Sequence, residues 1–244
     1  MSNVHWRELK NLVLVAGHAI YIAEDFIDPV GDDSWCLQPF QKGEPPFYVE
    51  HIYNGVELAA ADPYSLLIFS GGQTRTEAGP RSEAQSYWMV AKHFLWWHRA
   101  GVELRATTEE FARDSFENLL FGVCRFFECT ESYPETITVV SWAFKEGRFN
   151  LHTDAIDFPN SNFVFRGVNN PVDLLSAQKG EAKAVTLFSE DPYGTGEILG
   201  GKREERNPFS RKPPYESSNP KIAELLRYSG SEKFKGRLPW QTGL

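Results

Sequence analysis

The sequence predicts an α/β fold, a Rossmann-like three-layer sandwich with a mainly parallel sheet and a basic, Pro-rich C-terminal extension. Short apolar segments rich in β-branched and aromatic residues alternate along the chain with longer segments of helical periodicity. Such alternation favours right-handed crossovers and a parallel sheet covered on both faces. At 244 residues, with 41% hydrophobic and 14% aromatic residues, the chain is long and apolar enough to bury a sizeable core.

Four segments have the composition of buried strands, and each lies next to Gly, Pro or Asn. They span residues 12–16, 66–70, 137–141 and 162–166. A segment rich in Asp, Pro and Gly, residues 24–47, follows the first strand and contains Trp35. Ligands of such sheets gather at the carboxyl ends of the strands, where the strand order reverses, so we expect this segment to cover that edge.

Helical periodicity and cap signals predict the remaining elements. Helices are expected over residues 49–61, 82–99, 108–128, 172–188 and 220–228. Two capping-box patterns support the second and third of these, Ser82-x-x-Gln85 and Thr107-x-x-Glu110. Another helix is expected to begin near Lys145. Residues 191–218 are dense in Gly, Pro, Lys and Arg and predict extended chain.

We expect one Rossmann-like domain over residues 1–190, followed by a C-terminal segment, residues 191–244, with a short terminal helix. The net charge of −8 argues against general nucleic-acid binding, which requires a basic field. The charge is unevenly distributed, because residues 201–244 hold 10 Lys and Arg against 5 Asp and Glu. This basic end either docks on the acidic body or forms a solvated, partly disordered tail.

The cysteines and the hydropathy favour a cytoplasmic protein. Three cysteines without a Cys-x-x-Cys pair fit neither a disulfide framework nor a common zinc motif, and they are interpreted as reduced thiols. The apolar run over residues 12–23 contains His18 and Tyr21, so it is too short and too polar to span a bilayer. No convincing cleavage site follows a charged start.

The strand that ends in Ser70-Gly71-Gly72-Gln73 carries the first candidate site, with Arg75 close by. Consecutive glycines allow positive φ and close ligand approach, so their amides can form an anion-binding nest. An arginine adds a bidentate contact to phosphate or carboxylate. A plain turn with an exposed arginine is the alternative.

Further polar residues follow the other predicted strands or begin the crossovers. They are Gly17 and His18, Glu83, Ser115, Glu117 and Asn118, and Ser141, Lys145 and Arg148. A histidine after a strand either donates to a ligand or acts as an acid or base near neutral pH, although such a residue is also often structural. Glu83 is either a ligand contact or a carboxylate that complements its helix dipole. Glu117 and Asn118 either hold ribose hydroxyls, orient Arg75, or lie on a solvated helix face. Lys145 and Arg148 share a helix face and either flank an anion or form an ordinary exposed basic face.

The order and spacing of these pieces resemble the DUF218 family, also described as the SanA/YdcF-like family. Its pattern runs from an apolar strand through Ser-Gly-Gly, a Ser-Glu-Ala helix start, an acidic residue leading to Thr-x-Glu-Asn, and Val-Thr with a downstream His and Arg. The matching pieces are Ser70-Gly71-Gly72, Ser82-Glu83-Ala84, Glu109 with Ser115-Phe116-Glu117-Asn118, and Val140-Ser141 with Lys145 and Arg148. They cover roughly residues 12–168.

The resemblance implies a Rossmann-like fold, and a bacterial relative is described as binding S-adenosylmethionine. Ser115 stands where the family usually has Thr, and Lys145 stands where bacterial members usually have His, so a proton-transfer role of that His is not carried over. Gly17-His18-Ala19-Ile20-Tyr21, the loop around Trp35, and Lys212-Pro213-Pro214-Tyr215 are similar to a eukaryotic, fungal branch. No activity is firmly attached to the family.

Three functions are therefore expected as alternatives. The first is binding of a small anionic or nucleotide-like ligand, S-adenosylmethionine among them, at the strand ends. The second is a hydrolase or transferase acting on a phosphorylated or pyrophosphate substrate, with Glu83 or His18 as acid/base and a divalent cation held by Glu83, Glu109 or Asp114. The third is an interaction module that uses the basic tail. His93 and His98 lie five residues apart on a predicted helix without a third ligand, so no dedicated metal site is predicted.

Overall fold

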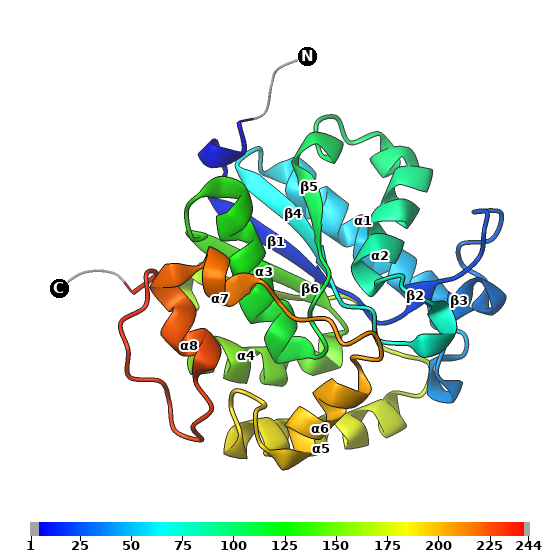
Figure 1. Ribbon diagram of the computed structural model, residues 1–244. Helices are drawn as coiled ribbons and strands as arrows, with labels where there is room; N and C mark the ends of the chain where they lie inside the picture. Colours follow the sequence, from blue (N-terminus) through cyan, green and yellow to red (C-terminus); the bar gives the residue numbers. More distant parts are fainter. Residues whose placement is uncertain (1–4, 242–244) are drawn as a thin grey trace.

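The computed structural model describes residues 5–241 and contains a five-stranded parallel sheet with helices on both faces (Figure 1), a Rossmann-like three-layer α/β fold. The sheet order is β5-β4-β1-β6-β7. The strands are β1 (Asn11–Ala16), β4 (Ser65–Ser70), β5 (Ala106–Glu109), β6 (Thr136–Ser141) and β7 (Phe163–Gly167). Along the chain these strands alternate with helices, and their spatial order reverses between β1 and β6. The carboxyl ends of β1 and β6 therefore frame the topological switch point of the sheet.

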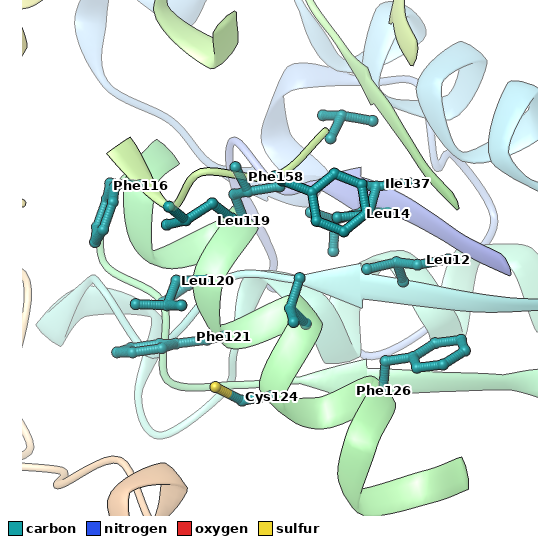
Figure 2. Packing of buried hydrophobic residues seen from close by; sticks show 14 of the residues in the cluster. Leu12, Leu14, Phe116, Leu119, Leu120, Phe121, Cys124, Phe126, Ile137 and Phe158 are labelled. Atoms are coloured by element: carbon teal, nitrogen blue, oxygen red, sulfur yellow. The ribbon is translucent and has the colours of Figure 1, made fainter. Parts of the chain in front are cut away.

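Alternating side chains of the central strands divide the core between the two faces. Val13 and Val15 of β1 pack with α1 (Pro45–Ala61) and α2 (Glu83–His93). Leu12 and Leu14 point to the opposite face, where they pack with α3 (Ser115–Thr130) and α4 (Glu146–Ala155), as Figure 2 shows for α3. Every residue of β4 is buried, which explains its continuous apolar sequence.

The four predicted strands are confirmed to within one residue at each end, but β5 was missed. The prediction of a helix over residues 108–128 is wrong at its start, because Thr107 lies in β5 and α3 begins only at Ser115. The cap of α3 is Asp114, whose carboxylate accepts a hydrogen bond from the Glu117 amide at 2.9 Å. Ser82 caps α2 as expected, since its hydroxyl accepts from the Gln85 amide at 2.9 Å.

Helix α2 ends at His93, not at Arg99 as the periodicity predicted. Residues 95–98 take positive φ angles of 51°, 53°, 47° and 58° and form a left-handed turn. The turn buries Trp96 against Phe69 and Trp88, with ring centroids 6.4 and 5.7 Å away. Burial of this large side chain offsets the steric cost of the left-handed backbone.

The loop predicted over residues 24–47 contains one short strand, β3 (Trp35–Cys36), and leads into α1. Strand β3 pairs antiparallel with β2 (Ile20–Tyr21), which precedes the loop, and this fixes Trp35 in the core against Tyr21. Helix α1 begins at Pro45, four residues before the predicted start at 49, with proline in its first turn.

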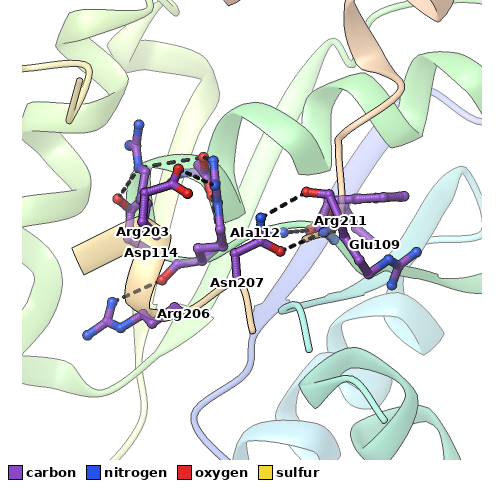
Figure 3. Close-up of polar contacts among 11 residues, drawn as sticks. Glu109, Ala112, Asp114, Arg203, Arg206, Asn207 and Arg211 are labelled. Carbon is purple, nitrogen blue, oxygen red and sulfur yellow. Dashed lines mark hydrogen bonds and ion pairs between the residues drawn. The ribbon is translucent and has the colours of Figure 1, made fainter. Parts of the chain in front are cut away.

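The C-terminal segment is folded and packs on the body of the protein, which confirms the docking alternative. Helix α5 (Leu174–Glu190) is followed by α6 (Glu197–Glu205), α7 (Tyr215–Ser218) and α8 (Ala223–Arg227). The prediction of extended chain over 191–218 is therefore wrong at α6 and at α7. Figure 3 shows Arg203 of α6 against Asp114, with Nε 2.6 Å from the carboxylate. The Tyr215 hydroxyl donates to Glu109 at 2.9 Å.

Within the described residues, no helix is long and apolar enough to cross a membrane. The three cysteines are free.

Candidate functional site

A cavity of about 590 Å³ lies at the carboxyl ends of the strands and is here named the strand-end cavity. Gly17 and His18 after β1, Arg75 after β4, and Ser141 after β6 line it. Gln41 and Glu44 contribute from the loop before α1, which confirms that this loop covers the sheet edge. The cavity thus occupies the switch-point position expected for a Rossmann-like sheet.

Most of the predicted site residues line this cavity, but five do not. The lining residues are Gly17, His18, Arg75, Glu83, Ser115, Asn118, Ser141, Lys145 and Arg148. Ser70, Gly71, Gly72, Gln73 and Glu117 lie outside the lining. The structure also contributes residues that the sequence analysis missed as site residues, chiefly Gln41, Glu44, Arg113, Glu181, Lys202 and Arg206.

The predicted anion nest at Gly71 and Gly72 is wrong. The Gly71 amide donates to the Glu109 carbonyl at 3.0 Å, and the Gly72 amide donates to the Ala112 carbonyl at 2.7 Å. Because both amides are used within the chain, neither is available to an anion. The Gln73 side chain likewise donates to the Pro80 carbonyl at 2.8 Å.

The glycines instead allow α2 to begin against the sheet. The Glu83 amide donates to the Gly72 carbonyl at 3.1 Å, and a Cβ on Gly71 would lie 2.6 Å from Glu83 Oε2. A Cβ on Gly17 would lie 2.7 Å from the Glu83 Cβ. Gly71 also has a φ of 152°, which favours glycine. Gly17 and Gly71, which follow two neighbouring strands, therefore leave the space that the Glu83 side chain occupies at the cavity.

Glu83 is a carboxyl group in a poorly solvated position. Its Oε1 accepts a hydrogen bond from the Thr74 hydroxyl at 2.7 Å. Burial raises the pKa of Glu83, while the Thr74 hydrogen bond and the charge of Arg206 act to lower it. The net shift is upward, so Glu83 holds a proton at higher pH than an ordinary glutamate does.

Glu117 and Asn118 have different roles from those predicted. Glu117 accepts two hydrogen bonds from the Arg113 guanidinium, at 2.9 and 2.6 Å, and lies 3.5 Å from Arg203. It therefore anchors these arginines and neither orients Arg75 nor lies on a solvated face. Asn118 accepts from the buried Ser70 hydroxyl at 2.8 Å, and its side chain lines the cavity.

The predicted divalent-cation site is also wrong. Glu109 is 1% exposed and accepts from Ser70 at 2.6 Å and from Tyr215 at 2.9 Å. Burial raises the pKa of Glu109 to about 7, against the lowering effect of those hydrogen bonds. Asp114 pairs with Arg203. Within residues 5–241, no group of three His, Cys, Asp or Glu side chains is arranged to hold a metal ion.

Lys145 and His18 meet in the cavity. Lys145 Nζ lies 3.4 Å from His18 Nδ1, and His18 Nε2 lies 3.4 Å from the Ser141 hydroxyl. The imidazole stacks on Trp142, with centroids 5.7 Å apart and an interplanar angle of 23°. Burial and the charge of Arg148 lower the pKa of Lys145 to about 7. Burial, with the charge of Lys145, lowers the pKa of His18 well below its usual value, so the ring is neutral at physiological pH.

Arg148 lines the cavity but is already paired. One of its guanidinium nitrogens lies 2.8 Å from Glu181 of α5, in a pair whose side chains are 15% and 10% exposed. Ser115 contacts the fully buried His152, with Oγ 2.7 Å from Nε2. Burial and Arg148 lower the pKa of His152 to about 3, so this histidine stays neutral. The sequence analysis gave His152 no role, since a lone histidine inside a helix carries no distinguishing pattern.

Four cations of the cavity have no carboxylate within 4.0 Å in the described part of the chain. They are Arg75, Lys145, Lys202 and Arg206. The last two come from α6 and the residue that follows it, in a segment predicted to be extended. Their i, i+4 spacing is the sequence signal that places them on one helix face. The Arg206 guanidinium donates to the Arg113 carbonyl at 2.9 Å, which holds the Arg206 side chain near the N-terminus of α3 (Figure 3).

Comparison with known proteins gives a relative without an assigned function. The chain is 31% identical to "Uncharacterized protein YOR238W" of Saccharomyces cerevisiae, over 96% of this chain and 98% of the yeast protein. No family model matches the chain, and no solved structure matches it. Because the similarity extends over nearly the whole of both proteins, the chain belongs to the same family as this yeast protein.

Proposed function

We propose that the strand-end cavity binds a small anionic, nucleotide-like ligand. The observation that carries this proposal is the set of four cavity cations without a carboxylate partner, Arg75, Lys145, Lys202 and Arg206. Arg75, Lys145 and Arg206 are partly buried, where unpaired cations are costly unless an anion neutralises them, whereas Lys202 is exposed and contributes only its charge. The cavity volume of about 590 Å³ lies within the range of small-molecule sites.

Aromatic side chains on the same wall support a nucleotide-like ligand over a simple anion. Phe40, Phe144 and the stacked pair of His18 and Trp142 line the cavity beside the cations. A planar base stacks on such rings while its anionic group meets the guanidinium groups. Polar groups of Asn118 and Ser141 are placed to hydrogen-bond a sugar or an amino-acid moiety.

We further propose that the chain belongs to a eukaryotic, fungal branch of the DUF218 family, that it is cytoplasmic, and that S-adenosylmethionine is among its ligands. Glu83, Ser115, Asn118, Lys145 and Arg148, which the resemblance matches from separate parts of the sequence, all line one cavity. The interaction-module alternative gains no support, since three arginines of the basic end contact the body of the protein. They are Arg203, Arg206 and Arg211.

A thermal-shift series tests the binding proposal. The ligands are inorganic phosphate, pyrophosphate, adenosine monophosphate and S-adenosylmethionine, each added to the wild type and to the Arg75→Ala and Arg206→Ala variants. A ligand at about 100 times its Kd stabilises by about 2.7 kcal/mol, which raises Tm by roughly 5–10 °C for a chain of this size. Loss of one charge-assisted contact weakens binding about 10- to 100-fold.

The matched control is Arg227→Ala, which removes an exposed arginine paired with Glu216 far from the cavity lining. It is expected to keep the wild-type ligand response. If none of the four compounds raises Tm, and the cavity variants respond as the control does, the binding proposal is wrong.

A second candidate is a hydrolase or transferase acting on a phosphorylated or pyrophosphate substrate, and the state of Glu83 favours it. A carboxyl group with a raised pKa in a cation-lined cavity is better suited than an ordinary glutamate to protonate a leaving group. His18 is neutral and therefore positions substrate by hydrogen bonding. The Glu83→Gln variant is expected to abolish turnover in a phosphatase and pyrophosphatase screen while ligand-induced stabilisation persists. Wild-type protein without turnover on any substrate of the screen would refute this candidate.

A further inference from the structure

The position of Lys145 differs from that of an ordinary surface lysine. It lies in the turn between β6 and α4, and its side chain lines the strand-end cavity. Within residues 5–241 no carboxylate lies within 4.0 Å of Nζ, and the polar contact that it makes there is with His18 Nδ1, 3.4 Å away. An unpaired ammonium in a desolvated position is destabilised relative to the neutral amine.

The titratable groups around Lys145 come from several neighbouring segments. They are His18 after β1, Glu44 before α1, His51 of α1, Glu83 of α2, Arg148 of α4 and Glu181 of α5. Glu181 is engaged by Arg148 at 2.8 Å, so the two carboxyls left to face the lysine are those of Glu44 and Glu83. With burial as the largest effect and Arg148 next, the pKa of Lys145 falls to about 7, and a large share of its amine is unprotonated at neutral pH.

Both facing carboxyls are suited to hold a proton near the amine. Glu83 accepts from the Thr74 hydroxyl at 2.7 Å, and Glu44 accepts from the Tyr48 hydroxyl at 2.7 Å. Burial raises the pKa of each, more than the hydroxyl contacts and nearby cations lower it. A lysine amine, a carboxyl group that can donate a proton, and a cavity that holds a carbonyl compound beside them are what is needed to make and dehydrate a carbinolamine.

We propose that Lys145 is a nucleophile that forms a Schiff base with a small aldehyde or ketone carrying a phosphate or carboxylate group in the strand-end cavity. The Nζ lone pair attacks the carbonyl carbon, and the C–N bond forms as the C=O π electrons pass to the oxygen. The oxygen then takes a proton from the nitrogen, which gives the carbinolamine hydroxyl. Glu83 or Glu44 then donates a proton to that hydroxyl, which leaves as water. The nitrogen loses its remaining extra proton to the carboxylate, so the balance is carbonyl plus amine to imine plus water, without change of oxidation state.

The anionic group of this substrate class is held by Arg75, Lys202 and Arg206, so this part of the inference rests on the proposed function. His18 Nδ1 accepts a hydrogen bond from the Lys145 amine and thereby holds Nζ within the cavity. The lysine stands at the position where the DUF218 pattern has histidine. That exchange replaces an imidazole with a primary amine, the group required for imine formation.

Borohydride trapping of carbonyl probes tests the proposal. Full-length protein is incubated with pyridoxal 5′-phosphate or with pyridoxal at neutral pH, reduced with sodium borohydride, digested, and the modified lysines are quantified by mass spectrometry. The exposed Lys183 on α5 is the internal reference. Lys145 is expected to be modified at least about tenfold faster than Lys183, because a much larger fraction of its amine is unprotonated. Pyridoxal 5′-phosphate is expected to modify it faster than pyridoxal, and inorganic phosphate is expected to slow that reaction.

Two substitutions complete the test. Lys145→Arg retains a cation but has no amine that forms an imine under these conditions, so the fast modification is lost. Lys183→Arg is the matched control and keeps it. Thermal melts establish that both variants are folded, and the mapping on wild-type protein decides the question even if Lys145→Arg does not fold.

The outcomes separate this proposal from the binding proposal. If Lys145 is modified no faster than Lys183, the nucleophile is refuted, although phosphate that still raises Tm upholds the anion site. Fast modification by both probes at equal rates, unaffected by phosphate, upholds the nucleophile and overturns its selectivity for anionic carbonyl compounds.

Discussion

The ion pair of Arg203 with Asp114 gives the sharpest stability prediction, because it joins the C-terminal segment to the start of α3. Arg203 Nε lies 2.6 Å from the Asp114 carboxylate, and both side chains are 9% exposed. Removing one partner of a buried pair costs about 3–5 kcal/mol, since the remaining charge stays buried. Without Arg203, Asp114 still accepts the hydrogen bond from the Glu117 amide at 2.9 Å, and Glu117 still pairs with Arg113. We therefore expect Arg203→Ala to cost about 3 kcal/mol, at the lower end of that range.

The same pair predicts how this loss changes with pH. Burial alone raises the pKa of Asp114, and the charge and hydrogen bond of Arg203 reverse this and hold it below its usual value. In the wild type, Asp114 therefore stabilises the fold above its unfolded pKa, and this contribution is lost as the pH falls. In Arg203→Ala the two largest effects that oppose burial are lost and the Glu117 amide remains, so the pKa of Asp114 rises and the carboxyl of the folded variant binds a proton at higher pH than in the wild type. The destabilisation is thus largest at about pH 7.5 and smaller at about pH 5.

Urea unfolding followed by circular dichroism at both pH values measures the effect. Arg227→Ala is the matched control, since its pair with Glu216 has side chains that are 57% and 55% exposed, and it is expected to cost less than about 1 kcal/mol. A loss for Arg203→Ala equal to that of the control, or larger at the lower pH, would refute the reasoning.

Two further substitutions test the framework of the site. Gly71→Ala places a Cβ 2.6 Å from Glu83 Oε2 and is expected to cost about 2 kcal/mol or more in urea unfolding, whereas Gly147→Ala, which meets nothing within 4 Å, is expected to be neutral or stabilising. Equal stabilities of the two variants would contradict the close packing of α2 on the strand ends. Tyr215→Phe removes the 2.9 Å hydrogen bond to the buried Glu109 and is expected to cost about 1.5–3 kcal/mol, a loss that Tyr64→Phe at an exposed position does not share. A wild-type denaturation midpoint for Tyr215→Phe would count against a buried Glu109.

The sequence predicts the central strands well because burial on both faces leaves a continuous apolar run. Strand β4 is the clearest case, with every residue buried. Strand β5 has the sequence Ala-Thr-Thr-Glu, and its polar edge position gives it no such run. The pattern Thr107-x-x-Glu110 also resembles a helix cap, whereas the residue that caps α3 is Asp114. Helix α6 contains two glycines and was missed because its stability comes from packing, not from propensity.

The location of the site was predicted more securely than the role of each residue in it. Strand ends converge in any parallel sheet, so Gly17, Arg75 and Ser141 meet at the cavity as the topology requires. Hydrogen-bond partners depend on segments distant in sequence, and no local pattern gives them. The Gly71 and Gly72 amides donate to the carbonyls of residues 109 and 112. The Glu117 carboxylate pairs with Arg113 and Arg203.

The position of helix α6 in the chain also determines at which stage of synthesis the lining of the strand-end cavity is complete. All five strands of the main sheet precede it in the chain, so they can assemble while Lys202 and Arg206 are still inside the ribosome. Until the later residues emerge, Phe111 and Phe121, which contact Tyr215, and Phe158, which contacts Trp240, lack these partners. A nascent chain at this stage is a target for chaperones and lacks two of the cavity cations. A chain whose translation stops before α6 therefore exposes apolar side chains and lacks Lys202 and Arg206 of the cavity.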